Sequence, residues 1–171
     1  SADVRHSAAR IVLNGLRAAL AANGEPLLDR MRLEKAASGG GDGAGVLFTD
    51  TRLSAEDAAL CNQQLWLYFL LDDVEPRSGI HPGGPAITAA LALAEQSGRS
   101  GKAVSGQQFL NAVVAGIEVQ VAIALAQPAA AAVAGPKGEG LGQSLKMAPH
   151  QRGCGAFFWF CVPALLWFPL R

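Results

Sequence analysis

Apolar positions recurring at helical spacing along most of the chain predict a structure made mainly of helices. Between them lie short stretches rich in Gly, Pro, Ser and Asn, which interrupt the pattern and favour turns. Helices are expected at residues 3–22, 26–37, 55–71, 86–96 and 107–125. The pattern therefore predicts an all-α fold, mostly a helical bundle.

Two local signals show where the chain changes conformation. The segment GVLFT at residues 45–49 has the composition of a strand, so at most one or two short strands are expected. Ser54 directly precedes the third helical pattern, and its hydroxyl can accept a hydrogen bond from the first helical turn. Asp57 adds a negative charge where the helix dipole favours one. We expect Ser54 to be the N-cap of that helix.

The segment DDVEPRSGIHPGGP, at residues 72–85, is the most informative one for chemistry. Two adjacent carboxylates, Asp72 and Asp73, raise the free energy unless a cation, a proton or solvent relieves their repulsion. His81 is the nearest candidate, because imidazole changes charge near neutral pH, with an unperturbed pKa of about 6.5. Prolines and glycines fix a bend around it. The segment predicts a site; the alternative is a solvated helix end beside a surface histidine.

The expected helix over residues 55–71 would bring Asp72 and Asp73 to its C-terminal end. The helix dipole is negative there, so two carboxylates would be placed unfavourably. This placement favours a compensating partner and strengthens the interpretation of the segment as a site.

Composition narrows the classes of protein and partner. The 171 residues suit one domain, so a single helical domain over residues 1–171 is expected. Only 16% of residues are charged, below the roughly 25% of an average domain, which indicates a fragment or a self-associating protein. Fourteen basic residues balance fourteen acidic ones, without a basic stripe, so nucleic-acid binding is excluded.

Cysteines and apolar runs bear on location. Cys61, Cys154 and Cys161 lack metal-ligand or redox spacing, and buried thiols in a reducing compartment are expected. The start lacks the pattern of a secretory signal, so the cytoplasm is expected. The apolar run at residues 157–168 is 12 residues long, short of the roughly 20 that span a membrane. It predicts a buried helix, and no membrane partner is expected.

Several segments together resemble the MmgE/PrpD family, whose best-known activity is 2-methylcitrate dehydratase. In chain order they read AALCNQQLWLYFLLDD, GIHPGGPAITAALALAEQSGRSGK, FLNAVVAGIEVQVAIALA and APHQRGCGAFFWF. The resemblance implies the N-terminal part of a large helical domain, which in relatives is joined to a smaller α+β domain in a homodimer. It also implies a small polycarboxylate substrate, transformed by proton transfer next to a carboxylate, with no metal and no cofactor.

Carried over residue by residue, the resemblance assigns the catalytic site to four side chains. His81 matches the histidine of an H-P-G motif, and Asp72 and Asp73 match the last two acids of D-F-D-D. His150 matches a second histidine. The resemblance predicts a lyase or isomerase, and the alternative is an inactive helical remnant that serves as an association module.

The chain departs from the family pattern around this site. The family's upstream histidine, first aspartate and small polar residue are replaced by Leu67, Leu70 and Val74. Its tyrosine and arginine on the later helix are replaced by Ile117 and Ala122. The family's catalytic lysines would lie beyond position 171, so the positive charge that binds substrate carboxylates is expected to be largely absent from this chain.

Overall fold

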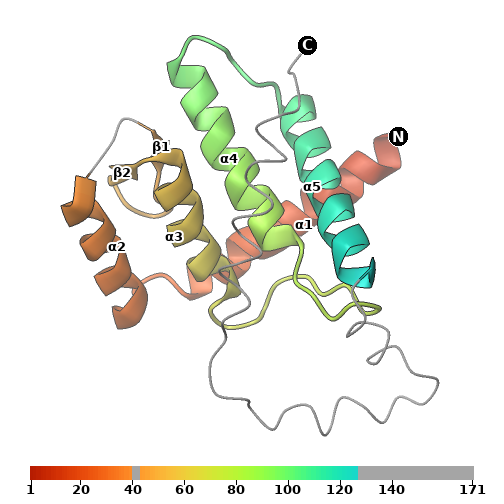
Figure 1. The fold of residues 1–171 in the computed structure, drawn as a ribbon, viewed down its shortest axis with the longest axis horizontal. Coiled ribbons are helices and arrows are strands. Elements are labelled where there is room, and N and C mark those ends of the chain that lie inside the picture. The colour runs from red at the N-terminus through yellow and green to blue at the C-terminus, as the bar shows by residue number, and fades with distance from the viewer. Residues whose placement is uncertain (40–42, 127–171) are drawn as a thin grey trace, which may run out of the picture.

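The computed structural model describes residues 1–39 and 43–126, and in these ranges five helices and one small sheet are found (Figure 1). The helices are α1 (Ala2–Ala21), α2 (Pro26–Gly39), α3 (Ala55–Leu67), α4 (Gly83–Arg99) and α5 (Gly106–Ala126). Strands β1 (Ala44–Gly45) and β2 (Arg52–Leu53) pair antiparallel, with Ala44 opposite Leu53. The predicted all-α fold is confirmed for this part of the chain.

Helix α4 lies between α3 and α5, and α1 crosses behind all three (Figure 1). Helix α2 packs on the outer side of α3. Trp66 of α3 is fully buried where α1 and α3 meet, and Gly15 of α1 leaves room for its indole. Trp66 is the largest fully buried side chain, and its core cluster also includes Leu65, Ile87 and Val113.

A second core cluster lies between the two-stranded sheet, α2 and α3. It contains Val46, Leu53 and the buried thiol of Cys61. Asn62, buried on α3, accepts a hydrogen bond from the Leu47 amide at 2.8 Å and donates one to the Gly45 carbonyl at 3.0 Å. Because both bonds hold backbone groups, the segment around β1 is fixed on α3.

The predicted start of α3 is confirmed, and its predicted end is wrong. The Asp57 amide donates to the Ser54 hydroxyl at 3.1 Å, so Ser54 is the N-cap. The helix ends at Leu67, not at residue 71. A turn closes there with a 3.0 Å hydrogen bond from the Leu70 amide to the Leu67 carbonyl, and Leu70 takes a left-handed conformation with φ of 53°. This turn redirects the chain before it reaches Asp72.

The other boundaries differ by less. The predicted strand over residues 45–49 is displaced, because the chain turns at residues 47–48 and the strands lie on either side of that turn. The fourth helix begins at Gly83 and ends at Arg99, which extends the expected range of 86–96 at both ends. Cys154, Cys161 and the apolar run at residues 157–168 lie outside the described residues.

Among the described helices, α5 is long and apolar enough to cross a membrane, judged by length and composition. A core helix of a soluble protein can meet the same criterion, and α5 packs against both α4 and α1. It also carries Glu118 and a buried polar side chain, Gln120. Packing within the bundle accounts for only part of its apolar surface, since 28% of its most apolar window is buried.

Candidate functional site

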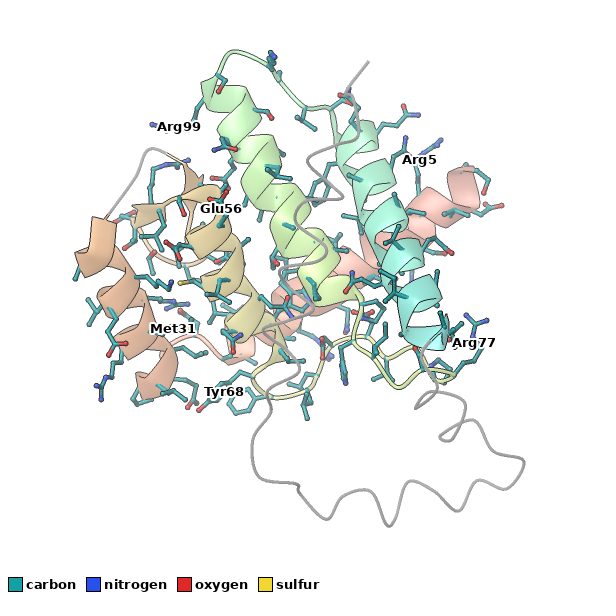
Figure 2. The ribbon with its side chains drawn as sticks, viewed as in Figure 1. Arg5, Met31, Glu56, Tyr68, Arg77 and Arg99 are labelled. Carbon is teal, nitrogen blue, oxygen red and sulfur yellow. The ribbon has the colours of Figure 1, made fainter. Side chains whose placement is uncertain are left out.

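The candidate site lies at the end of the bundle where α4 begins and α5 ends. The chain between α3 and α4 runs along this end, with Tyr68 and Arg77 at different points of it (Figure 2). Asp72, Asp73 and His81 all belong to this connecting segment. The structure therefore keeps three of the four predicted site residues within one segment.

His81 and Asp72 form a pair. The His81 Nδ1 atom lies 2.9 Å from the Asp72 Oδ1 atom, and the Asp72 side chain is fully buried while that of His81 is 25% exposed. An ionised carboxylate can only accept hydrogen bonds, so Nδ1 carries the proton in this contact. In the neutral ring, Nε2 is then the basic nitrogen. The pair can orient an imidazole that accepts a proton at Nε2.

Asp73 has a different partner from its neighbour. Its Oδ2 atom accepts a hydrogen bond from the Gly83 amide at 3.0 Å, at the first turn of α4. Pro82, which occupies the N-cap position, contributes no side-chain cap, so the carboxylate that caps this helix comes from ten residues earlier in the chain. A Cβ at residue 83 would collide with Asp73 Oδ1, so Gly83 is required for this contact.

The expected unfavourable placement of the two acids at the end of α3 is wrong. The turn at Leu70 separates both carboxylates from that helix end and turns Asp73 towards the positive end of the α4 dipole. Burial nevertheless raises the pKa of Asp73, and the charge of Asp72 raises it further. The Gly83 hydrogen bond and His81 act in the opposite direction, and burial prevails.

The loop between these acids and His81 is held by Glu75. Its carboxylate accepts hydrogen bonds from Arg77 Nε at 2.6 Å and from the Ser78 amide at 2.9 Å. The Ser78 hydroxyl and Arg77 lower the pKa of Glu75 to about 2. A backbone hydrogen bond from the Glu75 amide to the Ile80 carbonyl closes the loop at 2.9 Å. The bend predicted around His81 is therefore present, and Arg77 is engaged by Glu75.

Two buried glutamine side chains contact the start of α4, and the sequence patterns did not single them out. Gln63 of α3 packs so closely on Gly84 that a Cβ there would lie 2.7 Å from its Oε1 atom. Gln120 of α5 donates from Nε2 to the Pro82 carbonyl at 3.0 Å. The available signal was a polar residue within an apolar helical stretch, VQV at residues 119–121, because such a residue needs a partner when buried.

Three acceptor atoms at the start of α4 are buried without a hydrogen-bond partner among the described residues: Gln63 Oε1, Asp72 Oδ2 and Asp73 Oδ1. A buried polar atom without a partner costs roughly 1–3 kcal/mol, so each of these oxygens favours a donor. The site therefore contains more hydrogen-bond acceptors than donors among these buried side-chain atoms.

His150 lies outside the described residues, so its relation to His81 stays a prediction. Leu70 and Val74, which stand where the family pattern has polar residues, are 64% and 55% exposed. Within residues 1–39 and 43–126, no group of three or more His, Cys, Asp or Glu side chains converges on a possible metal position.

Comparison with known proteins identifies one family. The family model for the MmgE/PrpD N-terminal domain matches residues 1–134 of this chain. Neither the curated proteins nor the solved structures contain a match. The matched range includes every described residue and the whole segment from Asp72 to His81.

Proposed function

The chain belongs to the MmgE/PrpD family, and we propose that it carries the N-terminal helical part of a lyase or isomerase that acts on small polycarboxylates. The proposed reaction removes or adds a proton at a carbon next to a carboxylate, as in dehydration of 2-methylcitrate. The remaining parts of the active site come from residues outside the described ranges or from further protein.

The observation that carries this proposal is the hydrogen bond between His81 and the buried carboxylate of Asp72. Asp72 holds the proton of the ring at Nδ1, so the neutral imidazole offers Nε2 as a base. Proton removal next to a carboxylate creates an enolate-like charge. In a dehydration the hydroxyl group on the neighbouring carbon then leaves, and protonated His81 can supply the proton with which it departs as water; in an isomerisation His81 returns the proton to carbon. General acid–base catalysis of this kind contributes about 10²–10⁴-fold.

The charges of the segment bear on what the rest of the protein must supply. A polycarboxylate substrate needs cationic donors, because its negative charge grows in the transition state. The Arg77 guanidinium, which lies in this segment, is held by Glu75, and Asp72 and Asp73 add negative charge. We propose that the cations binding the substrate come from parts of the protein outside this segment.

Exchange of substrate protons with solvent is the sharpest test. Purified protein is incubated in D₂O with 2-methylcitrate, cis-aconitate or iminodisuccinate, and deuterium incorporation and turnover are followed by NMR and mass spectrometry. His81→Asn keeps a donor near the Nδ1 position but removes Nε2, and is expected to lower exchange by about 10²–10⁴-fold. His6→Gln, at an exposed position of α1, is the matched control and should leave exchange unchanged.

Two outcomes would contradict the proposal. The first is that His81→Asn exchanges protons or turns over substrate as fast as the control variant His6→Gln. The other is absence of exchange with all three acids, also when a protein carrying the rest of the family pattern is added. In the second case a non-catalytic role becomes the better account of the chain.

A second function, an association module without catalysis, is favoured by the exposed apolar side chains. On the segment after α3, five of seven residues are exposed and apolar or aromatic: Tyr68, Phe69, Leu70, Leu71 and Val74. Large exposed apolar patches mark interaction sites in soluble proteins. Light scattering after size-exclusion chromatography tests this function, because a monomer would exclude an association module. An oligomer is compatible with both functions, since the family resemblance also implies a homodimer, and the proton-exchange experiment then decides between them.

A further inference from the structure

The buried glutamine of α5 is the feature that the proposed reaction leaves unexplained. Gln120 is 3% exposed, and its Nε2 atom donates to the Pro82 carbonyl at 3.0 Å and to the Gly116 carbonyl at 3.1 Å. Two carbonyl oxygens around one corner of the side-chain amide identify that corner as the NH₂ group, since a carbonyl cannot donate.

The position of Gln120 depends on the close approach of α5 to α4. Gly116 lies one turn before Gln120, and a Cβ at residue 116 would be 3.0 Å from the Cβ of Ala86. Without a side chain at Gly116 the two helices come near enough for the glutamine to reach the backbone of the first turn of α4. The hydrogen bond thus joins residues 38 positions apart in the chain.

Pro82 is the residue directly after His81, and its carbonyl accepts only a long hydrogen bond from its own helix. The Ala86 amide reaches it at 3.4 Å, longer than the 3.0 Å bond from Gln120. The same short turn is held on its other sides by Asp72 at the His81 ring and by Asp73 at the Gly83 amide. Three consecutive residues, 81–83, are therefore each held by a different side chain.

We propose that Gln120 is a positioning residue for His81: by fixing the Pro82 carbonyl it holds the imidazole in register with Asp72. Its importance for turnover rests on the proposed function, but its effect on the ring does not. A Gln buried on an apolar helix costs free energy unless its amide is hydrogen-bonded, and a residue serving only to fill space here could be apolar. The hydrogen bond to Pro82 accounts for the choice.

The test measures the tautomer of the His81 ring by NMR and needs no substrate. The chain has three histidines, so the ¹⁵N resonances of the imidazoles can be assigned by substitution of each one, and exposed His6 serves as an internal reference. In the unsubstituted protein, neutral His81 is expected as the Nδ1–H tautomer, whereas a solvent-exposed ring favours Nε2–H. Asp72→Asn calibrates the loss of the carboxylate partner.

Gln120→Met removes the donor with little change of shape, and Gln107→Met is the control at an exposed position of the same helix. The expected result is that Gln120→Met moves the His81 ring shifts towards those of His6, while Gln107→Met leaves them in place. On an acid that the protein turns over, kcat should fall by up to about 10²-fold, the effect of misplacing a catalytic group, with KM less affected.

A Gln120→Met protein that melts at a lower temperature but keeps the His81 shifts of the original would overturn the proposal, because it would show a structural role alone. So would an original protein in which His81 is not the Nδ1–H tautomer. If Gln120→Met does not fold, hydrogen exchange of the Gln120 side-chain amide in the original protein decides. Exchange as fast as that of exposed Gln107 would exclude the hydrogen bond to Pro82.

Discussion

At the scale of single residues, two neighbouring carboxylates have separate tasks because they face separate partners. Asp72 is paired with the His81 ring, and Asp73 accepts from the first amide of α4. Their mutual repulsion is relieved by an imidazole and by a helix N-terminus, respectively. Only Asp72 contacts the group proposed to transfer protons, so substitutions of the two residues should have different effects.

Asp73 is expected to tolerate an amide and not an apolar side chain. In Asp73→Asn, the side-chain oxygen can still accept from Gly83 and no charge is buried, so stability at pH 7 should be equal or higher. Asp73→Ala loses the cap and should be less stable by about 0.5–2 kcal/mol. Urea unfolding measures both, with Asp50→Asn at an exposed position as control.

The pH dependence of stability offers a check on the same residue. The pKa of folded Asp73 lies above its ordinary value of 3.8, so the folded state binds the proton more tightly than the unfolded chain. Stability contributed by this group therefore falls as pH rises from 3.8 through the raised folded pKa. Asp73→Asn should abolish that decline; a decline that persists unchanged would show that another group is responsible.

Glu75 should affect the pH dependence of stability in the opposite direction to Asp73. Its folded pKa is about 2, below the ordinary 4.5, so its contribution to stability is present above pH 4.5 and is lost as pH falls towards 2. Glu75→Gln should flatten the loss of stability over this range. Thermal unfolding at a series of pH values measures it, with Asp50→Asn at an exposed position as control. Identical acid profiles for Glu75→Gln and the original protein would contradict the assignment.

At the scale of elements, the sequence predicted what local periodicity and caps determine. The helices over residues 2–21, 26–39 and 106–126 begin and end within two residues of the expected positions, and Ser54 caps α3 as expected. The end of α3 was missed because leucine is a helix former, and nothing local announces a left-handed residue at Leu70. Tertiary contacts of the following segment decide that turn, among them the hydrogen bond from Asn14 to the Leu71 carbonyl.

The contact between α1 and α3 gives a prediction at this scale. In a helix, Gly→Ala stabilises by roughly 0.5–1 kcal/mol when the methyl group has room. At Gly15 a methyl group would overlap the buried indole of Trp66, so Gly15→Ala should destabilise by about 1–3 kcal/mol or more. Gly98→Ala on α4 is the matched control, since nothing lies within 4 Å of its added Cβ.

Denaturant unfolding of four proteins tests the cause of that effect. Trp66→Leu is destabilised by the cavity it leaves, and Gly15→Ala added to it should cost less than in the original background, because the obstruction is gone. If Gly15→Ala lowers the free energy of unfolding equally in the original protein and in Trp66→Leu, the overlap with Trp66 is not the cause of the destabilisation. A stabilising Gly15→Ala would show that α1 and α3 are farther apart than in this structure.

At the scale of the whole molecule, the sequence predicted the candidate residues but not how they are held. Asp72, Asp73 and His81 lie within ten positions of one another, so a motif can contain them all. The residues that follow His81 are contacted from other helices, at Gly84 by Gln63 of α3 and at Pro82 by Gln120 of α5. These contacts span distances along the chain that no local pattern records. The roles of the two acids likewise became distinct only once the helix that each one faces was known.

The surface of the whole molecule carries a further sign of association at Leu70. This leucine is 64% exposed and has a φ of 53°, a conformation that costs an L-residue roughly 1–2 kcal/mol and that asparagine adopts more readily. Neither burial nor backbone preference within the described residues favours a leucine there. Contact with another protein surface would, since its apolar side chain would then be removed from water.

Leu70→Asn should therefore leave the free energy of unfolding unchanged or raise it, by up to about 1 kcal/mol, while weakening self-association. Sedimentation equilibrium over a range of concentrations measures the association, and urea unfolding of the dilute protein measures stability. Leu33→Gln removes an exposed leucine of α2, 71% exposed, away from this segment, and should leave association as it was. Equal association constants for the two variants would mean that the segment after α3 is not the interface. A loss of stability in Leu70→Asn would instead mean that the leucine packs against its own chain. That packing would then offset its unfavourable backbone conformation, and no partner would be needed to explain it.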